Sequence, residues 1–252
     1  MAHALGHERI RIMKNPARKA AFVMTLIIAL WLRAGAGGAQ QADQAAVLKS
    51  VDAAVSYRFQ NVLGFTAIEH YAVYRGGDET HAVAKMTVKD TYKKGAGKEY
   101  TVLSQSGSGV VVHFGLKPLL ENEKTINLPG NVEQSWFNTT NYEMKLKPGG
   151  VAKVNGRDCF VLDVRAKREA PNTIDGTLWV DAQSGMIVRL DGTATKRPSV
   201  LAGPTHMMRD YINLSGFPMA SHARAESDSM LIGRIVVTID YSDYHLQLRE
   251  NK

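Results

Sequence analysis

Apolar and polar residues alternate over most of the chain beyond residue 65, in short runs that end at Gly, Asn, Asp or Pro. Alternation with a period of two is typical of strands that bury one face of a sheet, and the bounding residues favour tight turns. In residues 81–92, for example, Ala84, Met86 and Val88 fall on one face, whereas lysine and threonine occupy the other. This contrast predicts a mainly β fold, built as an antiparallel sheet with one buried and one solvent-exposed face.

We expect roughly ten strands from this pattern. They cover residues 66–74, 81–92, 99–106, 135–147, 151–154, 158–165, two strands within 176–192, 219–227 and 234–246. The dipeptide Asn155-Gly156 predicts a type I′ hairpin, because both residues tolerate the positive φ angles that this turn requires.

Helical spacing is found in two places. In residues 42–63 the apolar residues follow steps of three and four, which predicts an amphipathic helix that ends at Gly64. The residues on that stripe are Ala46, Val47, Val51, Ala54, Val55, Phe59 and Val62. Residues 109–147 interrupt the strand pattern, and residues 116–126 within them have helical character. An insertion of this kind between strands is where a mobile cover is expected.

The N-terminal segment has the pattern of an export signal. Residues 20–32 are thirteen uncharged residues, mostly apolar, too few for the about 20 that span a membrane. Basic residues precede this run and small residues follow it up to Ala39, as in a cleaved signal peptide. We therefore expect residues 1–39 to be the signal and residues 40–252 to be one mature domain in the periplasm. Met13 begins a more typical signal than Met1, and an uncleaved anchor is the alternative.

The signal also explains the positive charge. The whole chain carries 31 Lys and Arg against 24 Asp and Glu, a net charge of +7. Residues 1–39 hold six of these bases and one acid, which leaves 25 bases against 23 acids in the rest of the chain. With no basic stripe elsewhere, no nucleic-acid partner is expected.

Two runs of the predicted hairpins carry a family resemblance. Residues 154–167 (VNGRDCFVLDVRAK) and 176–192 (GTLWVDAQSGMIVRLDG) resemble the LolA-like group of periplasmic proteins. That group includes the lipoprotein carrier LolA, its relative LolB and the sensor RseB. The matched features are the Gly156 turn, the strand around Trp179, the Ser184-Gly185 turn and the strand that returns after it. The likeness loosely covers residues 42–248.

This resemblance implies an open half-barrel, which is a curved antiparallel sheet with an apolar concave face capped by one or two helices. It also implies a cavity that shelters acyl chains of lipids or lipoproteins. Assigning faces from the strand pattern, we expect the cavity to be lined by Met86, Val88, Phe160, Leu162, Val164, Leu178, Ile235, Val237 and Ile239. Phe114, Trp136 and Phe137 flank the helical insertion and are candidates for a lid.

The expected function is therefore that of a carrier, without a cofactor or an enzymatic activity. Its partners would be lipid or lipoprotein acyl chains, with an inner-membrane donor and an outer-membrane acceptor in lipoprotein sorting. The alternative is an envelope-stress sensor or protein-binding scaffold of the RseB type. Four methionines between Met207 and Met230 are either ordinary core residues or an adaptable wall for an apolar ligand.

Catalytic and metal-binding patterns are weak. The six histidines beyond residue 39 are scattered, with no HExxH motif, and no metal site is expected. His222 has no carboxylate obviously placed to orient its ring. Residues 106–109 resemble a nucleophile elbow only in composition and are interpreted as a flexible turn, so a periplasmic hydrolase is the third possibility. Cys159, the single cysteine, is predicted to be a small packing residue.

Overall fold

The computed structural model describes residues 43–170, 172–196, 202–229 and 233–250. The predicted signal, residues 1–39, lies outside the described residues, as do both candidate start positions. The segment Ala42–Lys252 forms one compact unit. Within the described part of the chain, no helix is both long enough and apolar enough to cross a membrane.

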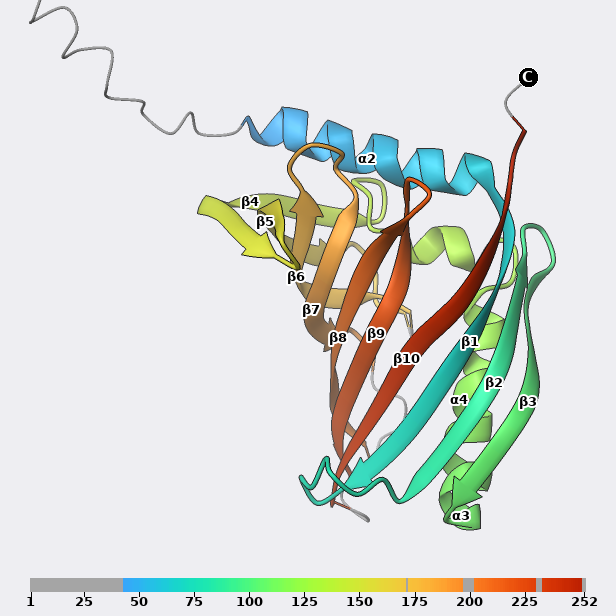
Figure 1. Cartoon of the computed structure of the whole chain (residues 1–252). Coiled ribbons are helices and arrows are strands. Elements are labelled where there is room, and N and C mark those ends of the chain that lie inside the picture. The colour runs from blue at the N-terminus through green and yellow to red at the C-terminus, as the bar shows by residue number, and fades with distance from the viewer. Residues whose placement is uncertain (1–42, 171, 197–201, 230–232, 251–252) are drawn as a thin grey trace, which may run out of the picture. The chain divides into compact units, whose positions relative to one another are not determined.

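The main element is one antiparallel sheet of ten strands, which curves without closing into a barrel (Figure 1). Its strands are β1 Val62–Arg75, β2 Ala84–Lys93, β3 Gly97–Gly107, β4 Tyr142–Val154, β5 Arg157–Ala166, β6 Ile174–Asp181, β7 Ile187–Ala194, β8 Ala202–Leu214, β9 Phe217–Ser229 and β10 Gly233–Leu248. This confirms the predicted fold class, an open, curved antiparallel sheet with a small number of helices.

The strands follow one another in space almost as they do in sequence, in the order β3-β2-β1-β10-β9-β8-β7-β6-β5-β4. The two edge strands, β3 and β4, are consecutive in the chain, so the segment between them has to cross from one edge of the sheet to the other. The last strand, β10, is inserted between β1 and β9, and its Ile239 lies opposite Tyr71 of β1.

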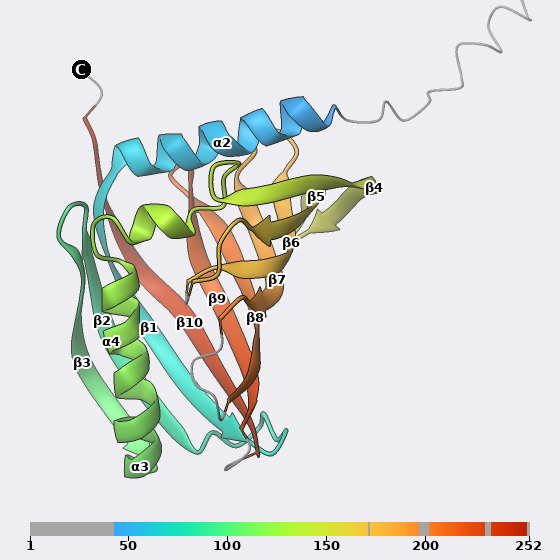
Figure 2. The ribbon, with the colours of Figure 1, turned by 180° about the vertical axis from the view of Figure 1, so that it is seen from behind.

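The helices cover one face of this sheet. Helix α2 (Gln44–Asn61) lies across one end of the sheet, and the Asp43 side chain caps it by accepting a hydrogen bond of 3.0 Å from the Ala45 N–H. The crossing segment contains α3 (Gly109–Val111), a π-helical turn η1 (Val112–Leu116), α4 (Lys117–Ile126) and a 3₁₀ turn η2 (Val132–Ser135). Figure 2 shows α4 running along the concave side of β1, β2 and β3.

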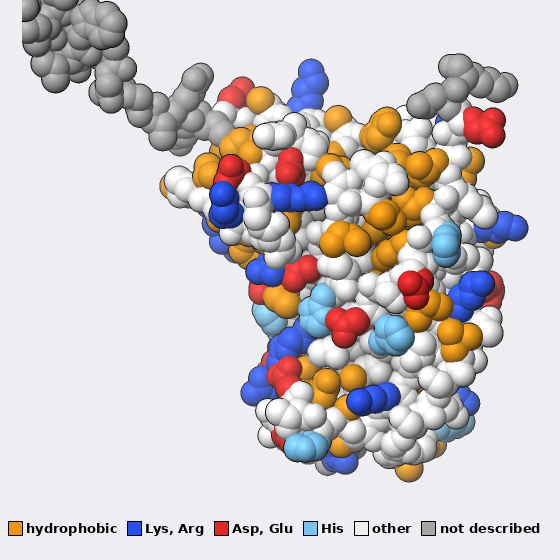
Figure 3. Space-filling model, viewed as in Figure 1, with side chains coloured by type: hydrophobic (Ala, Val, Ile, Leu, Met, Phe, Trp, Pro, Cys, Tyr) orange, Lys and Arg blue, Asp and Glu red, His pale blue; other side chains and the backbone are white. Residues whose placement is uncertain are grey.

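The core has two main parts, one under each helical element. Val47 and Val51 of α2 pack on inward-facing residues of β4 to β7, whereas Val112, Leu116 and Leu120 pack on β1, β2, β9 and β10. The opposite face of the sheet carries mainly polar and charged side chains, with apolar ones gathered toward its α2 end (Figure 3). The predicted contrast between a buried and a solvent-exposed face is therefore confirmed.

The predicted helix at 42–63 is confirmed as α2, although Val62 and Leu63 already belong to β1. The predicted strands 135–147 and 151–154 are one strand, β4, which begins only at Tyr142 and has a shift in register between Leu146 and Val151. Residues 135–141 are not in a strand. Strand β8 was not predicted. The predicted number of ten strands agrees with the structure only because β4 was predicted as two strands. Residues 106–109, interpreted as a flexible turn, end β3 and begin α3, where the Ser108 side chain accepts a hydrogen bond from the Val111 N–H.

The Asn155-Gly156 turn is confirmed, since these residues have φ angles of 50° and 79°. Cys159 is fully buried beside Val154 and Val188, which confirms its predicted role as a packing residue.

Candidate functional site

A cavity of about 350 Å³ lies on the concave face, between the sheet, α2, α4 and the segment around η2. This volume is within the range of small-molecule sites, roughly 300–1,000 Å³. Apolar residues of α2, of α4, of the η2 segment and of the sheet line this cavity and form its apolar wall. The residues of that wall include Val55, Phe59, Leu119, Ile126, Phe137, Ile187, Leu190, Met207 and Met219.

Aromatic contacts form the part of the wall between α2 and the η2 segment. The ring of Trp136 packs against Phe59 of α2, with 4.2 Å between the ring centres. Phe137 stacks on Tyr142 of β4 at 4.8 Å. Because Phe59, Trp136 and Phe137 all border the cavity, these contacts join the wall to the core of the sheet.

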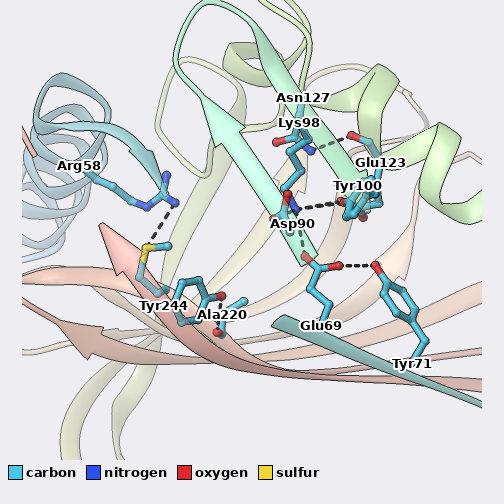
Figure 4. A network of polar contacts seen from close by, with 11 residues as sticks. Arg58, Glu69, Tyr71, Asp90, Lys98, Tyr100, Glu123, Asn127, Ala220 and Tyr244 are labelled. Atoms are coloured by element: carbon cyan, nitrogen blue, oxygen red, sulfur yellow. Dashed lines mark hydrogen bonds and ion pairs between the residues drawn. The ribbon is translucent and has the colours of Figure 1, made fainter. Parts of the chain in front are cut away.

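A buried polar cluster forms the wall on the side of β1, β2 and β3 (Figure 4). Lys98 Nζ lies 2.9 Å from Asp90 Oδ2 and donates a hydrogen bond of 3.3 Å to Glu69 Oε1. Glu69 also accepts a hydrogen bond of 2.5 Å from the Tyr71 hydroxyl, and Glu123 of α4 lies 3.9 Å from Lys98. A single cation therefore lies among three carboxylates.

Strand alternation places these charges inside. Asp90 follows Ala84, Met86 and Val88 at two-residue spacing and is as buried as they are, with no exposed surface. Burial raises the pKa of Asp90 to about 7, Lys98 opposes this, and neighbouring Glu69 adds to it. Burial disfavours the charge on Lys98, but Glu69, Tyr100 and Asp90 hold the pKa of Lys98 well above its usual value. Asp90 therefore takes up a proton near neutral pH.

Two arginines border the cavity on another side. Arg58 of α2 donates a hydrogen bond of 3.1 Å to the Pro218 carbonyl, and its Nη2 lies 3.8 Å from Met219 Sδ. Arg209 of β8 interacts with Tyr211, and its buried Nε has no hydrogen-bond partner in the described structure. Burial lowers the pKa of Arg58. Among described residues, no carboxylate lies within ion-pair distance (4.0 Å) of either guanidinium.

The nine residues expected to line the cavity lie on the concave side but do not border this cavity, although the structure describes all of them. Met86, Val88, Ile235, Val237 and Ile239 belong to the cluster under α3 and α4. Phe160, Leu162, Val164 and Leu178 belong to the cluster under α2. The helices cover these residues, and the space that remains lies between the two clusters.

Two of the three lid candidates border the cavity. Trp136 and Phe137 border the cavity, whereas Phe114 is 74 % exposed and does not border it. Met207 and Met219, from the methionine-rich region, do border it, and Met230 lies outside the described residues.

The charged residues of the site were not predicted from the sequence. Glu69 and Asp90 each occupy an inward position in an otherwise apolar row of β1 or β2, which is the signal that could have found them. Arg58 lies within the apolar stripe of the predicted helix, four residues after Ala54, and Arg209 lies on the missed strand.

The prediction that no carboxylate is placed to orient the ring of His222 was wrong. His222 Nδ1 lies 2.7 Å from Asp240 Oδ1, because the register of β9 and β10 places these residues directly opposite each other. In the described chain, no group of three or more His, Cys, Asp and Glu side chains is arranged to hold a metal ion.

Comparison with known proteins finds neighbours only at the level of structure. No protein-family model and no curated protein matches the sequence. The fold is similar to that of LolA-like proteins. A domain assigned to outer membrane lipoprotein sorting from Vibrio parahaemolyticus is 14% identical, with a TM-score of 0.45, and the match covers 80% of this chain and 93% of that one.

Two further neighbours belong to the groups that the sequence resembles. A LolA superfamily protein from Nitrosomonas europaea is 14% identical with a TM-score of 0.41, and the match covers 84% of this chain and 96% of that one. MucB, solved in complex with MucA, is 13% identical with a TM-score of 0.26, over 79% of this chain and 93% of that one. These proteins are similar to this chain in structure, and the function has to be argued from the cavity itself.

Proposed function

We propose that this protein binds the acyl part of a lipid or lipoprotein and carries it through the periplasm. The observation that supports this proposal is the cavity on the concave face, whose wall is largely apolar and aromatic and which is covered by α2, α4 and the η2 segment. A wall of this kind suits the binding of an apolar ligand.

The energetics favour an acyl ligand. Each methylene group that moves from water into an apolar site gains about 0.8 kcal/mol. A methylene group occupies about the same volume as a water molecule in the liquid, ~30 Å³. A cavity of about 350 Å³ would then hold on the order of a dozen methylene groups, enough to bind one chain firmly.

The direction of transport is part of the proposal. A predicted export signal and an acyl-binding cavity together suit a carrier that receives its ligand at the inner membrane and delivers it at the outer membrane. Lipoproteins are the cargo that we propose, with an inner-membrane donor and an outer-membrane acceptor as partners.

Filling the cavity tests the proposal. Ala54 of α2 borders the cavity, whereas Ala53, the preceding residue, is exposed on the opposite side of the helix. We expect Ala54→Trp to reduce acyl-chain binding by roughly tenfold and Ala53→Trp to leave it unchanged. Bound lipid would be measured by native mass spectrometry of the purified protein without residues 1–39, and by titration with laurate.

A second filling variant guards against misfolding, because a tryptophan can overpack the site. Ala220→Leu adds less volume to the cavity wall from the side of β9. Folded variants of both kinds that bind as much acyl ligand as Ala53→Trp would contradict the proposed function.

The alternative function, a sensor or scaffold that binds a protein, has one feature in its favour. Strand β3 is an edge strand, and its Val102 and Leu103 are 44% and 54% exposed. An exposed edge can accept a strand from another chain. If the purified protein contains no lipid in its cavity and forms a stable complex with a protein partner, this alternative is supported.

A further inference from the structure

We propose that the cavity selects a single-chain amphiphile with an anionic head, either a carboxylate or a phosphate, and that Arg58 and Arg209 bind this head. The inference rests on the proposed function, since it names the class of acyl ligand that the same cavity takes.

The first argument is the state of the two arginines. Both border the cavity, and no carboxylate among the described residues forms an ion pair with either. A buried charge without a partner is costly, and buried charges are normally paired. The Arg209 Nε has no acceptor in the described chain although it is buried, which leaves one strong donor to be satisfied. An anion in the cavity would supply the missing acceptor.

The second argument is the separation of charge inside the cavity. Lys98 is held among Glu69, Asp90 and Glu123 by contacts of 3.9 Å or less. That lysine is therefore already compensated, whereas the arginines are compensated only at longer range, Glu123 being the carboxylate that acts on Arg209. An incoming anion is attracted to the arginines and repelled by the carboxylates, so the head is placed on the arginine side.

The third argument is the position of Tyr211, which lies near both arginines and borders the cavity. Its hydroxyl is a further donor for a carboxylate or phosphate oxygen. Met207 is on the same face of β8 as Arg209 and Tyr211, and Ile187 and Leu190 of β7 border the same space. The acyl chain would lie over these apolar residues while its head meets the guanidinium groups.

The size of the cavity suits one chain. About 350 Å³ corresponds to on the order of a dozen methylene groups if each occupies ~30 Å³. This is close to one chain of the length of laurate.

Three ligands with the same chain length and different heads test the inference: laurate, dodecanol and dodecyltrimethylammonium. Each would be titrated by calorimetry into delipidated protein without residues 1–39, with laurate and dodecyltrimethylammonium below their micelle concentrations and dodecanol below its solubility limit. We expect laurate to bind at least about tenfold more tightly than either of the others. Arg209→Leu should bring laurate within about threefold of dodecanol, and Arg209→Lys should keep part of the preference.

The matched control is Arg165→Leu, which removes the same charge from an exposed position on β5. It should leave the preference unchanged. Arg209→Leu is expected to fold, because it removes the desolvation cost of a buried charge that has no ion-pair partner among the described residues. Acetate distinguishes a simple anion site from an amphiphile site, and it should not displace laurate at equal concentration.

The outcomes separate the two proposals. Dodecanol or the cationic amphiphile binding as tightly as laurate would overturn the anionic head and leave the acyl carrier in place. Displacement of laurate by equimolar acetate would also overturn the amphiphile inference. Failure of all three twelve-carbon ligands to bind would overturn the proposed function and this inference together.

Discussion

The carboxylate of Asp52 accepts two hydrogen bonds from Thr139, one of 2.8 Å from its backbone N–H and one of 2.5 Å from its hydroxyl group. Asp52 lies in α2, and Thr139 lies 87 residues further along, just before β4. These bonds join α2 to the segment that carries Trp136 and Phe137, so they hold together two parts of the cavity wall.

We expect Asp52→Ala to lower the free energy of unfolding by about 1–3 kcal/mol, because it leaves the half-buried Thr139 donors without their acceptor. Urea denaturation followed by circular dichroism would measure this change. Asp158→Ala is the control, since Asp158 is exposed and its nearest cation, Lys153, is 3.9 Å away. Equal stability of the two variants would show that the Asp52 bonds contribute nothing.

Gly185 allows α2 to pack closely against the turn between β6 and β7. It has a φ of 70°, and a Cβ atom added there would lie 2.6 Å from the backbone of Ser50 in α2. Gly156 has a similar φ of 79° in another hairpin, but a Cβ added there meets nothing within 4 Å. Gly185→Ala should therefore destabilise the protein by about 2 kcal/mol more than Gly156→Ala, in which only backbone strain acts. Thermal unfolding of both variants checks this difference.

The buried Asp90 predicts an unusual dependence of stability on pH. Its pKa is about 7 in the folded protein, against an ordinary value of 3.8. Between these values the folded state binds a proton that the unfolded state does not bind, so stability rises as the pH falls. We expect the free energy of unfolding to increase by roughly 1–3 kcal/mol from about pH 8 to about pH 5.

Asp90→Asn tests the assignment of this effect, because asparagine imitates the protonated carboxyl without titrating. The variant should be more stable than the natural protein at about pH 8, and its stability should change little down to about pH 5. A variant that keeps the full pH dependence would assign the effect to another group. Asp181 is not that group, because its hydrogen bonds with Ser184 and Gln183 outweigh burial and lower its pKa, so it acts only under more acidic conditions.

Ligand binding should be visible through Trp136. In the protein without residues 1–39 the tryptophans are Trp136, which borders the cavity, and Trp179, which packs beside Cys159. Laurate should change the emission of Trp136 because it replaces water near the ring. The change should disappear in Trp136→Phe and remain in Trp179→Phe.

Phe114→Ser, at an exposed position outside the cavity, should not alter the laurate affinity.

The sequence predicted the parts of the fold that have regular patterns. Strand β2 was found because Ala84, Met86 and Val88 alternate with exposed lysines, and those inward positions are buried. Strand β8 was missed because its inward residues include Arg209 beside Met207 and Tyr211, so the row does not look like a buried face. A strand that borders a charged cavity departs from the pattern of a dry core.

The nine predicted lining residues lie outside this cavity for a related reason. Strand alternation identifies the concave face, but it does not show which part of that face the helices cover. Leu162 and Leu178 lie under α2, and Met86 lies under α4, so the most apolar positions became core. The polar contacts that form the site, such as Lys98 with Asp90, join different strands and depend on a register that the sequence does not display.

Strand β10 pairs with both β1 and β9, and these two strands do not pair with each other in the described structure. Until β10 is in place, β1–β3 and β4–β9 are therefore two partial sheets. The sixteen residues of β10 follow every other described strand in the chain. Without them, β1 and β9 each present an open edge of the kind that can pair with another chain. The docking of this one strand therefore closes two edges at once.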